Sequence, residues 1–148
     1  MSFEITNRGD FLYIRFFGVL LAQDLVCLAQ KLELVEDPAP VSTNWVTDLT
    51  SVQSFEISSG SISDFAHQLN GKAFHHTVKS AYIAQRSIEF GIARMFQGMN
   101  GHPQVMVHLV RNLQEALDWF GERAADPAFI DEHNLALQPK VMSSMNPQ

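Results

Sequence analysis

The first quarter of the chain changes from an alternating pattern of apolar residues to a helical one. Residues 3–7 alternate apolar and polar side chains, a turn signal follows at residues 8–10, and residues 11–17 are β-branched and aromatic up to Gly18. Two such runs around a glycine-containing turn predict a β-hairpin whose second strand stops at Gly18. From Leu21 apolar residues recur at spacings of three and four, which predicts a helix that ends at the prolines of residues 37–40.

The rest of the chain alternates strand patterns with helix patterns. Residues 44–49, 78–84 and 105–110 are short β-type runs, and a polar loop is expected at residues 50–54. Three further stripes have helical spacing: Ile62, Phe65, Ala66 and Leu69; Ile88, Ile92, Met95, Phe96 and Met99; and Leu113, Ala116, Leu117 and Phe120. Asn112 with Glu115 is typical of a capping-box start for the last stripe.

The predicted order is ββαβαβαβα, which indicates an α/β fold. Strands that alternate with helices favour parallel pairing with right-handed crossovers, and the hairpin adds an antiparallel strand. We therefore expect a mixed sheet of about five strands with about four main helices. One domain is expected over residues 1–122. Residues 123–148 are expected to be a C-terminal extension, with a short helix opened by Asp126 and Pro127 and then a mobile tail.

Composition narrows the class of protein. Of 148 residues, 46% are hydrophobic and 18% charged, which is typical of a globular chain. The formal net charge is −6. Because nucleic acid and anionic membranes are also negatively charged, we expect the chain to bind neither. The N-terminus lacks the basic and apolar regions of a signal peptide, and no apolar stretch approaches the ~20 residues of a membrane span. We expect a cytoplasmic protein without membrane insertion.

Few residues are arranged for catalysis or metal binding. The single cysteine cannot form an internal disulfide, and the six histidines show no ligand-like spacing, so no metal and no cofactor are expected. Asp48, at the expected end of a strand, is a general base, a metal ligand or a turn former. Arg86 and Arg94 either bind an anionic group or are solvated and pair with Glu89. No nucleophile–base pair can be assembled, so we expect no enzyme.

The segment from Trp45 to Val52, followed by Phe55 and by Ile57-Ser58-Ser59-Gly60, resembles the STAS domain. In that family a strand ends in Asp-Leu-Ser-type residues, and an Asp-Ser-Ser-Gly motif begins the next helix. The second half is similar to the SpoIIAA-like branch, uncharacterised bacterial proteins also labelled STAS/SEC14, through residues 79–84, 90–97 and 115–120. The resemblance covers roughly residues 3–122 and implies a STAS/SpoIIAA-like fold.

The resemblance also implies a function. Anti-sigma-factor antagonists of this family are partner-binding switches thrown by phosphorylation of the first serine of the motif, which is Ser58 here. Asp48, Ser59 and Gly60 are then the partner-surface candidates. One position departs from the family: Ile57 stands where kinase-regulated members have an acid. From the residues alone, Ser58 also suits a helix cap, or it is an idle loop residue beside a cap made by Ser61 and Asp64.

The strands are apolar on both sides, which leaves two further possibilities. Leu12, Ile14 and Phe16 share one side, whereas Phe11, Tyr13 and Phe17 occupy the other. A sheet apolar on both faces must be covered twice, by helices, by a second subunit or by a lipid-like molecule. We expect a homodimer with a regulatory protein partner. The alternative is a carrier or sensor of a small hydrophobic ligand, lined by Phe55, Phe65, Arg94, Met95, Phe96 and Met99.

Overall fold

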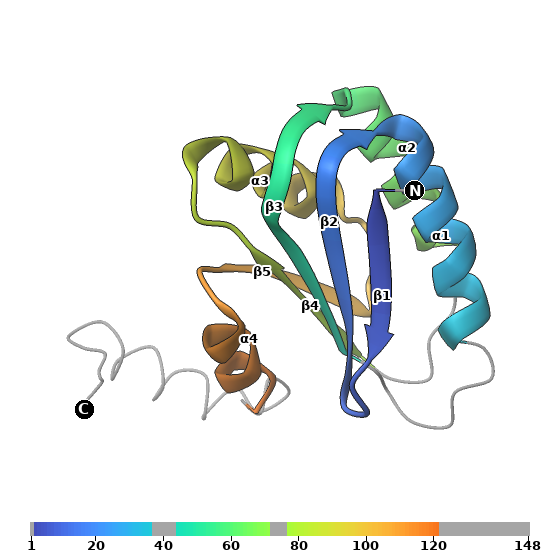
Figure 1. Ribbon diagram of the computed structural model, residues 1–148. Helices are drawn as coiled ribbons and strands as arrows, with labels where there is room; N and C mark the ends of the chain where they lie inside the picture. Colours follow the sequence, from blue (N-terminus) through green and yellow to red (C-terminus); the bar gives the residue numbers. More distant parts are fainter. Residues whose placement is uncertain (1, 37–43, 72–76, 122–148) are drawn as a thin grey trace.

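The computed structural model describes residues 2–36, 44–71 and 77–121. Over these ranges the chain forms the predicted order ββαβαβαβα (Figure 1). The elements are β1 (Phe3–Asn7), β2 (Phe11–Leu21), α1 (Ala22–Glu36), β3 (Asn44–Glu56), α2 (Ser59–Asn70), β4 (Val78–Ile83), α3 (Ser87–Met99), β5 (Val105–Val110) and α4 (Leu113–Phe120). The expected helix from Asp126, the expected tail, and His75, His76 and His133 lie outside the described residues.

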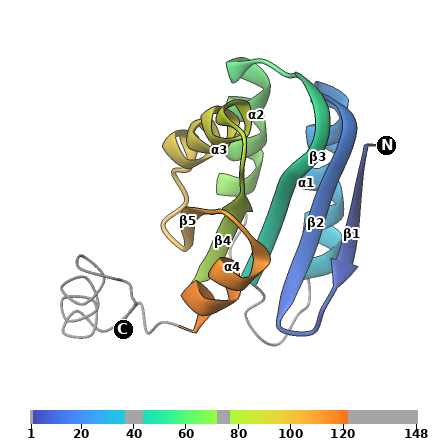
Figure 2. The same cartoon turned by 60° about the vertical axis from the view of Figure 1, so that its left-hand side comes forward.

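The sheet has the strand order β1-β2-β3-β4-β5, so each strand pairs with its neighbours in sequence. β1 is antiparallel to β2, and all the other pairs are parallel, as predicted. Helices α1, α2 and α3 connect consecutive parallel strands and pack on one face, whereas α4 covers β3, β4 and β5 from the other (Figures 1 and 2). The strands β1 and β5 form the two edges.

Both faces of the sheet carry apolar clusters, which explains why the strands are apolar on both sides. The larger cluster lies between the sheet and α1–α3, and the smaller one lies under α4. The larger cluster includes Leu12, Ile14 and Phe16 of β2 and Leu25, Leu28 and Leu32 of α1, each at most 2% exposed. Burial of one such side chain stabilises the fold by about 1.5–3 kcal/mol. The smaller cluster contains Phe11, Val46, Ala81, Ile83, Val110 and Ala116.

Two predicted strand ends are wrong. β2 does not stop at Gly18, and residues 50–54 are not a loop, because the parallel ladder continues from the pair Phe17↔Ser51 to Leu21↔Glu56. Gly18 has a φ of 66°, and the register shifts beside it. Glycine has no Cβ to clash in this conformation, so it provides an irregularity within the strand instead of terminating it.

Three members of the helical stripes do not face the core, and one of them, Leu117 of α4, is 37% exposed. Leu21 belongs to β2 and is 43% exposed, and Ile88 at the start of α3 is 52% exposed. Glu89, the next residue, is fully buried. The carboxylate of Glu89 accepts backbone N–H groups at the start of its own helix, so the first turn of α3 directs this side chain inward.

Candidate functional site

The N-termini of α1 and α2 lie at the same end of the molecule because β2 and β3 end in register. Leu21 is the last residue of β2 and pairs with Glu56, the last residue of β3. α1 begins at the next residue, Ala22, and α2 begins at Ser59. The Ser58-Ser59-Gly60 motif therefore lies beside the β2–α1 junction (Figure 1).

Ser58 is the N-cap residue of α2. Its backbone is extended, with φ −108° and ψ 167°, and its Oγ accepts a hydrogen bond from the amide of Ser61 at 3.1 Å. The hydroxyl of Ser61 lies 3.1 Å from the same oxygen. This confirms the interpretation of Ser58 as a helix cap and excludes the one in which Ser61 and Asp64 form the cap.

The motif remains open to solvent despite this capping role. Ser58, Ser59 and Gly60 are all exposed. The amides of Ser59 and Gly60 occupy the first two helical positions, where an α-helix offers no internal acceptor. Partial positive charge at this helix end favours an anion there. Ile57, immediately before the motif, is partly buried against the main core, so an acid at this position would lose hydration.

A cleft runs between α1 and α2 beside the motif. Its cavity volume is about 80 Å³, and its lining residues are Ala22, Leu25, Val26, Ser61, Asp64, Phe65 and Gln68. Val26, which lines the cleft, and Leu21, which directly precedes the lining residue Ala22, are each 43% exposed. This end of the molecule therefore combines a capping serine, unpaired amides and apolar surface.

Asp48 is not part of this cluster. It lies within β3, eight residues before the end of that strand, which is a path of about 26 Å in extended chain. The residue is 9% exposed. Its Oδ1 accepts hydrogen bonds from the amide of Thr50 at 2.9 Å and from the hydroxyl of Thr50 at 2.6 Å. The prediction that Asp48 marks a strand end is wrong, because β3 continues through the expected loop.

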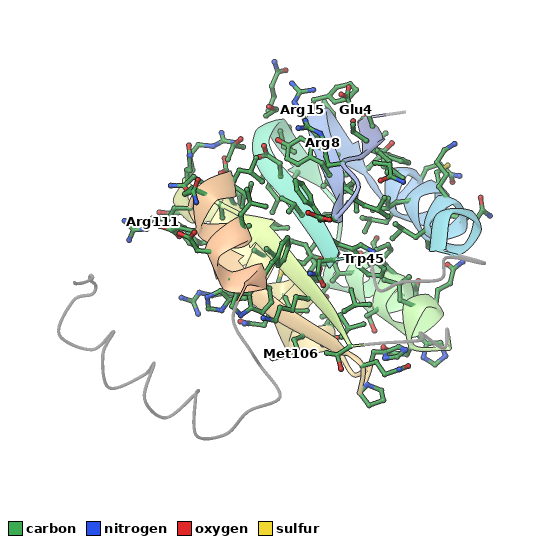
Figure 3. All side chains as sticks on the ribbon, turned by 90° about the horizontal axis from the view of Figure 1, so that it is seen from below. Glu4, Arg8, Arg15, Trp45, Met106 and Arg111 are labelled. Carbon is green, nitrogen blue, oxygen red and sulfur yellow. The ribbon has the colours of Figure 1, made fainter. Side chains whose placement is uncertain are left out.

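The other oxygen of Asp48 binds Tyr13, a partner that sequence reasoning missed. The Tyr13 hydroxyl donates to Oδ2 at 2.5 Å. Burial, together with this hydrogen bond, raises the pKa of Tyr13 to about 12. The guanidinium of Arg8 lies over the Tyr13 ring, 5.2 Å from its centroid, and Arg15 is further along the same surface (Figure 3). Asp48 is thus a hydrogen-bond acceptor that joins β3 to β2. Only the register between these two strands could have identified Tyr13 as its donor.

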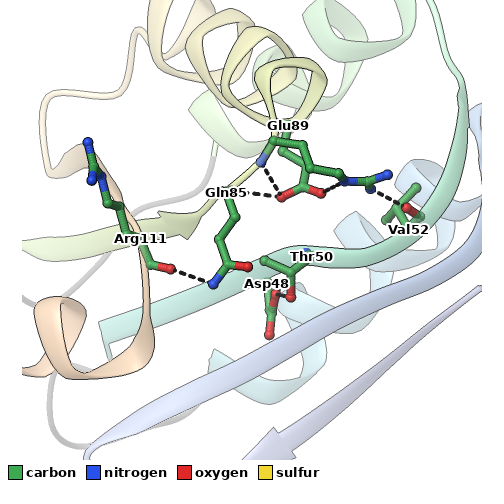
Figure 4. Close-up of polar contacts among 7 residues, drawn as sticks. Asp48, Thr50, Val52, Gln85, Glu89 and Arg111 are labelled. Carbon is green, nitrogen blue, oxygen red and sulfur yellow. Dashed lines mark hydrogen bonds and ion pairs between the residues drawn. The ribbon is translucent and has the colours of Figure 1, made fainter.

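A second polar network holds the start of α3 (Figure 4). The buried carboxylate of Glu89 accepts the amide of Gln85 at 2.8 Å and pairs with the Arg86 guanidinium. Arg86 also donates to the carbonyl of Val52 in β3 at 2.5 Å. The expected ion pair between an arginine and Glu89 is present for Arg86. Glu89, however, is fully buried, so this pair does not lie in solvent as a surface pair would. Arg94 is exposed.

The ligand-lining candidates contribute to a packed interior. Phe65 and Phe96 are buried and meet edge to face, with ring centroids 5.7 Å apart. Phe55, Met95 and Met99 are partly buried against the same core. The two cavities that Phe65 and Phe96 line have volumes of about 20 and 30 Å³, which is room for one or two water molecules.

Within residues 2–36, 44–71 and 77–121, no group of three or more His, Cys, Asp or Glu side chains is placed to hold a metal ion. No helix in the same ranges is both long enough and apolar enough to cross a membrane.

Comparison with known proteins identifies the fold. No protein-family model and no curated protein matches the chain. An uncharacterised DUF3478-family protein from Shewanella loihica PV-4, described as having a SpoIIAA-like fold, matches with a TM-score of 0.54 and 18% identity, over 80% of this chain and 91% of that one. The phosphorylated Bacillus cell-fate determinant SpoIIAA matches with a TM-score of 0.49 and 17% identity, over 80% and 99% of the two chains. The predicted SpoIIAA-like α/β fold is confirmed.

Proposed function

We propose that this domain, with its SpoIIAA-like fold, is a non-enzymatic regulatory module of STAS type that binds a protein partner. Its partner surface is the end of the molecule where α1 and α2 begin, and Ser58 is the residue whose phosphorylation switches binding. The observation that carries this proposal is the exposed Ser58 hydroxyl at the N-cap of α2, next to the amides of Ser59 and Gly60.

The local chemistry supports a phosphoryl group at this position. A phosphate on Ser58 adds negative charge and acceptor oxygens at a helix N-terminus, where the amides of Ser59 and Gly60 can donate to it. The first turn of α2 contains no acidic residue that would repel the added charge. Because the same hydroxyl now accepts the Ser61 amide, phosphorylation also changes the cap itself.

The surroundings of Ser58 support a protein partner. The cleft between α1 and α2 and the exposed side chains of Leu21 and Val26 provide apolar surface that a partner can bury. A phosphate added at the border of such a surface must be desolvated or accommodated when the partner binds, so one modification can change affinity. Ile57 in place of an acid implies a kinase that does not require an acidic residue directly before the serine.

The alternative of a hydrophobic ligand carrier receives no support from the interior. Pockets for drug-sized ligands have volumes of about 300–1,000 Å³. The cavities lined by Phe65 and Phe96 are about 20 and 30 Å³. A lipid-like molecule between α1–α3 and the sheet would need side chains of the core to move.

The proposal is tested on affinity-tagged protein produced in its own organism. We expect a fraction of the chain to carry one phosphoryl group, which Ser58→Ala removes and Ser59→Ala, the matched change at the adjacent exposed serine, does not. A phosphate that maps elsewhere, or that survives in Ser58→Ala, contradicts the assignment of Ser58.

Partner binding provides the second readout. We expect the partner that co-purifies with the wild type to be lost from Val26→Asp, because this change puts a charge on the proposed surface. Met106→Asp is the control, since Met106 is 38% exposed on the edge strand β5. Equal binding by both variants would place the partner on another surface.

A further inference from the structure

The two edges of the sheet differ in how many of their outward backbone groups are already hydrogen-bonded. On β5, the side-chain amide of Asn100 donates to the carbonyl of Val105 at 2.9 Å, and that of Gln97 donates to the carbonyl of Val107 at 3.1 Å. The amide of Val105 donates to the carbonyl of His102 at 3.2 Å. The chain itself therefore occupies much of the β5 edge, which is a common protection against strand addition.

The β1 edge is open within residues 2–36, 44–71 and 77–121. In the antiparallel pair, Arg8 donates to the Phe11 carbonyl and Phe17 donates to the Ser2 carbonyl, so the even-numbered residues of β1 direct their backbone groups toward β2. The N–H and C=O groups of Phe3, Ile5 and Asn7 consequently point away from the sheet. Among the described residues, no hydrogen bond reaches the backbone groups of these three residues.

This open edge is complementary to itself. We propose that β1 pairs antiparallel with β1 of a second copy of this chain, about a two-fold axis at Ile5, to form one continuous sheet through both copies. In that register Ile5 lies opposite Ile5 of the second copy, and Phe3 lies opposite Asn7. All three outward residues then exchange both backbone hydrogen bonds with the second copy, which no shifted register achieves.

The side chains also match in this register. On the face covered by α1–α3, the existing pair Ile5↔Ile14 lies beside the same pair of the second copy. The four isoleucines then form an unbroken row across the new interface. On the other face, Glu4 lies opposite Thr6 of the second copy, next to Arg15, whose guanidinium is 3.8 Å from the Glu4 carboxylate (Figure 3). No two like charges face each other directly across the new pair.

Sedimentation equilibrium over a dilution series, with two variants of Thr6, tests the proposal. Thr6 is exposed, so neither variant removes a core contact. Thr6→Glu places two glutamates opposite each other twice per dimer and is expected to raise the dimer Kd about two- to thirtyfold. Thr6→Lys, the matched control, places lysine opposite Glu4 and is expected to leave the Kd unchanged or to lower it. Thermal melting of both variants checks that the fold is retained.

Amide hydrogen exchange locates the interface. In the dimer, the amides of Phe3, Ile5 and Asn7 are expected to exchange slowly, and dilution to the monomer should expose these three while Glu4 and Thr6 remain protected by β2. A wild-type chain that is monomeric at every concentration overturns the proposal, as does a dimer in which the three odd-numbered amides exchange freely. A Kd that responds equally to Thr6→Glu and Thr6→Lys also overturns it. None of these outcomes bears on Ser58, which lies in a different part of the fold.

Discussion

Replacing Glu89 by glutamine removes a buried charge while keeping the shape of the side chain. One carboxylate oxygen accepts the amides of Gln85 and Arg86, at 2.8 and 3.3 Å, and the other pairs with the Arg86 guanidinium. Glutamine can still offer one carbonyl oxygen to the two amides. Its NH₂ group, however, is a donor that faces the guanidinium donor of Arg86.

The expected loss of stability follows from the replacement of one carboxylate oxygen of Glu89 by an NH₂ group. A hydrogen bond to a charged group contributes about 1.5–3 kcal/mol, and a buried pair that loses one partner costs more because the other charge is left unpaired. The Arg86 side chain is 51% exposed, so water can hydrate the guanidinium and reduce that extra cost. We therefore expect Glu89→Gln to lower the free energy of unfolding by about 2 kcal/mol, and the melting temperature by about 8 °C.

Urea denaturation measures this loss, and Glu115→Gln is the control. Glu115 also accepts a backbone amide at a helix start, from Arg111 at 2.9 Å, but Glu115 is exposed. The control should change the free energy of unfolding by no more than about 0.5 kcal/mol. If the two variants lose equal stability, or if Glu89→Gln loses less than about 0.5 kcal/mol, the reasoning from the burial of Glu89 is refuted.

Three further outcomes are expected. Burial raises the pKa of both tyrosines, that of Tyr13 to about 12, so spectrophotometric titration should show little tyrosinate in the folded protein near pH 10. The stability that Tyr13 contributes is complete below its unfolded pKa of 10.0 and is lost as the pH rises through 12. Gly18→Ala should cost about 1–2 kcal/mol in denaturation experiments because φ is positive there, whereas the same change at exposed Gly91 inside α3 should stabilise by about 0.5–1 kcal/mol. Ser58→Ala should cost about 1 kcal/mol by loss of the α2 cap, and a change below about 0.3 kcal/mol would contradict the capping geometry.

The helices were the most predictable part of the fold. The apolar spacing predicted for Ile62, Phe65 and Leu69 agrees with the structure of α2, since contacts along a helix join residues three or four positions apart. Strand ends were less predictable because they depend on the neighbouring strand. Residues 50–54 look like a loop, yet they are held in β3 because β2 continues beside them through Gly18.

The residues of the candidate site also differ in how far the sequence alone predicts their contacts. Ser58 could be identified from a local motif, because a cap and the amide it accepts are three residues apart. Asp48 was noticed, but its function as an acceptor depends on Tyr13, 35 residues earlier in the chain. No local pattern relates two residues at that separation.

The sequence by itself therefore determined the order of elements and the apolar faces of the helices, and it offered Ser58 as one of two candidate caps for α2, because these depend on spacings within a few residues. Only the tertiary structure decided where β2 and β3 end and that Glu89 is buried. It also decided that, among the described residues, the β1 edge is open whereas the side chains of Gln97 and Asn100 occupy that of β5. The physical reason is that strand pairing and burial join groups that are distant in the chain. Their partners are fixed only when the whole sheet and its covering helices assemble.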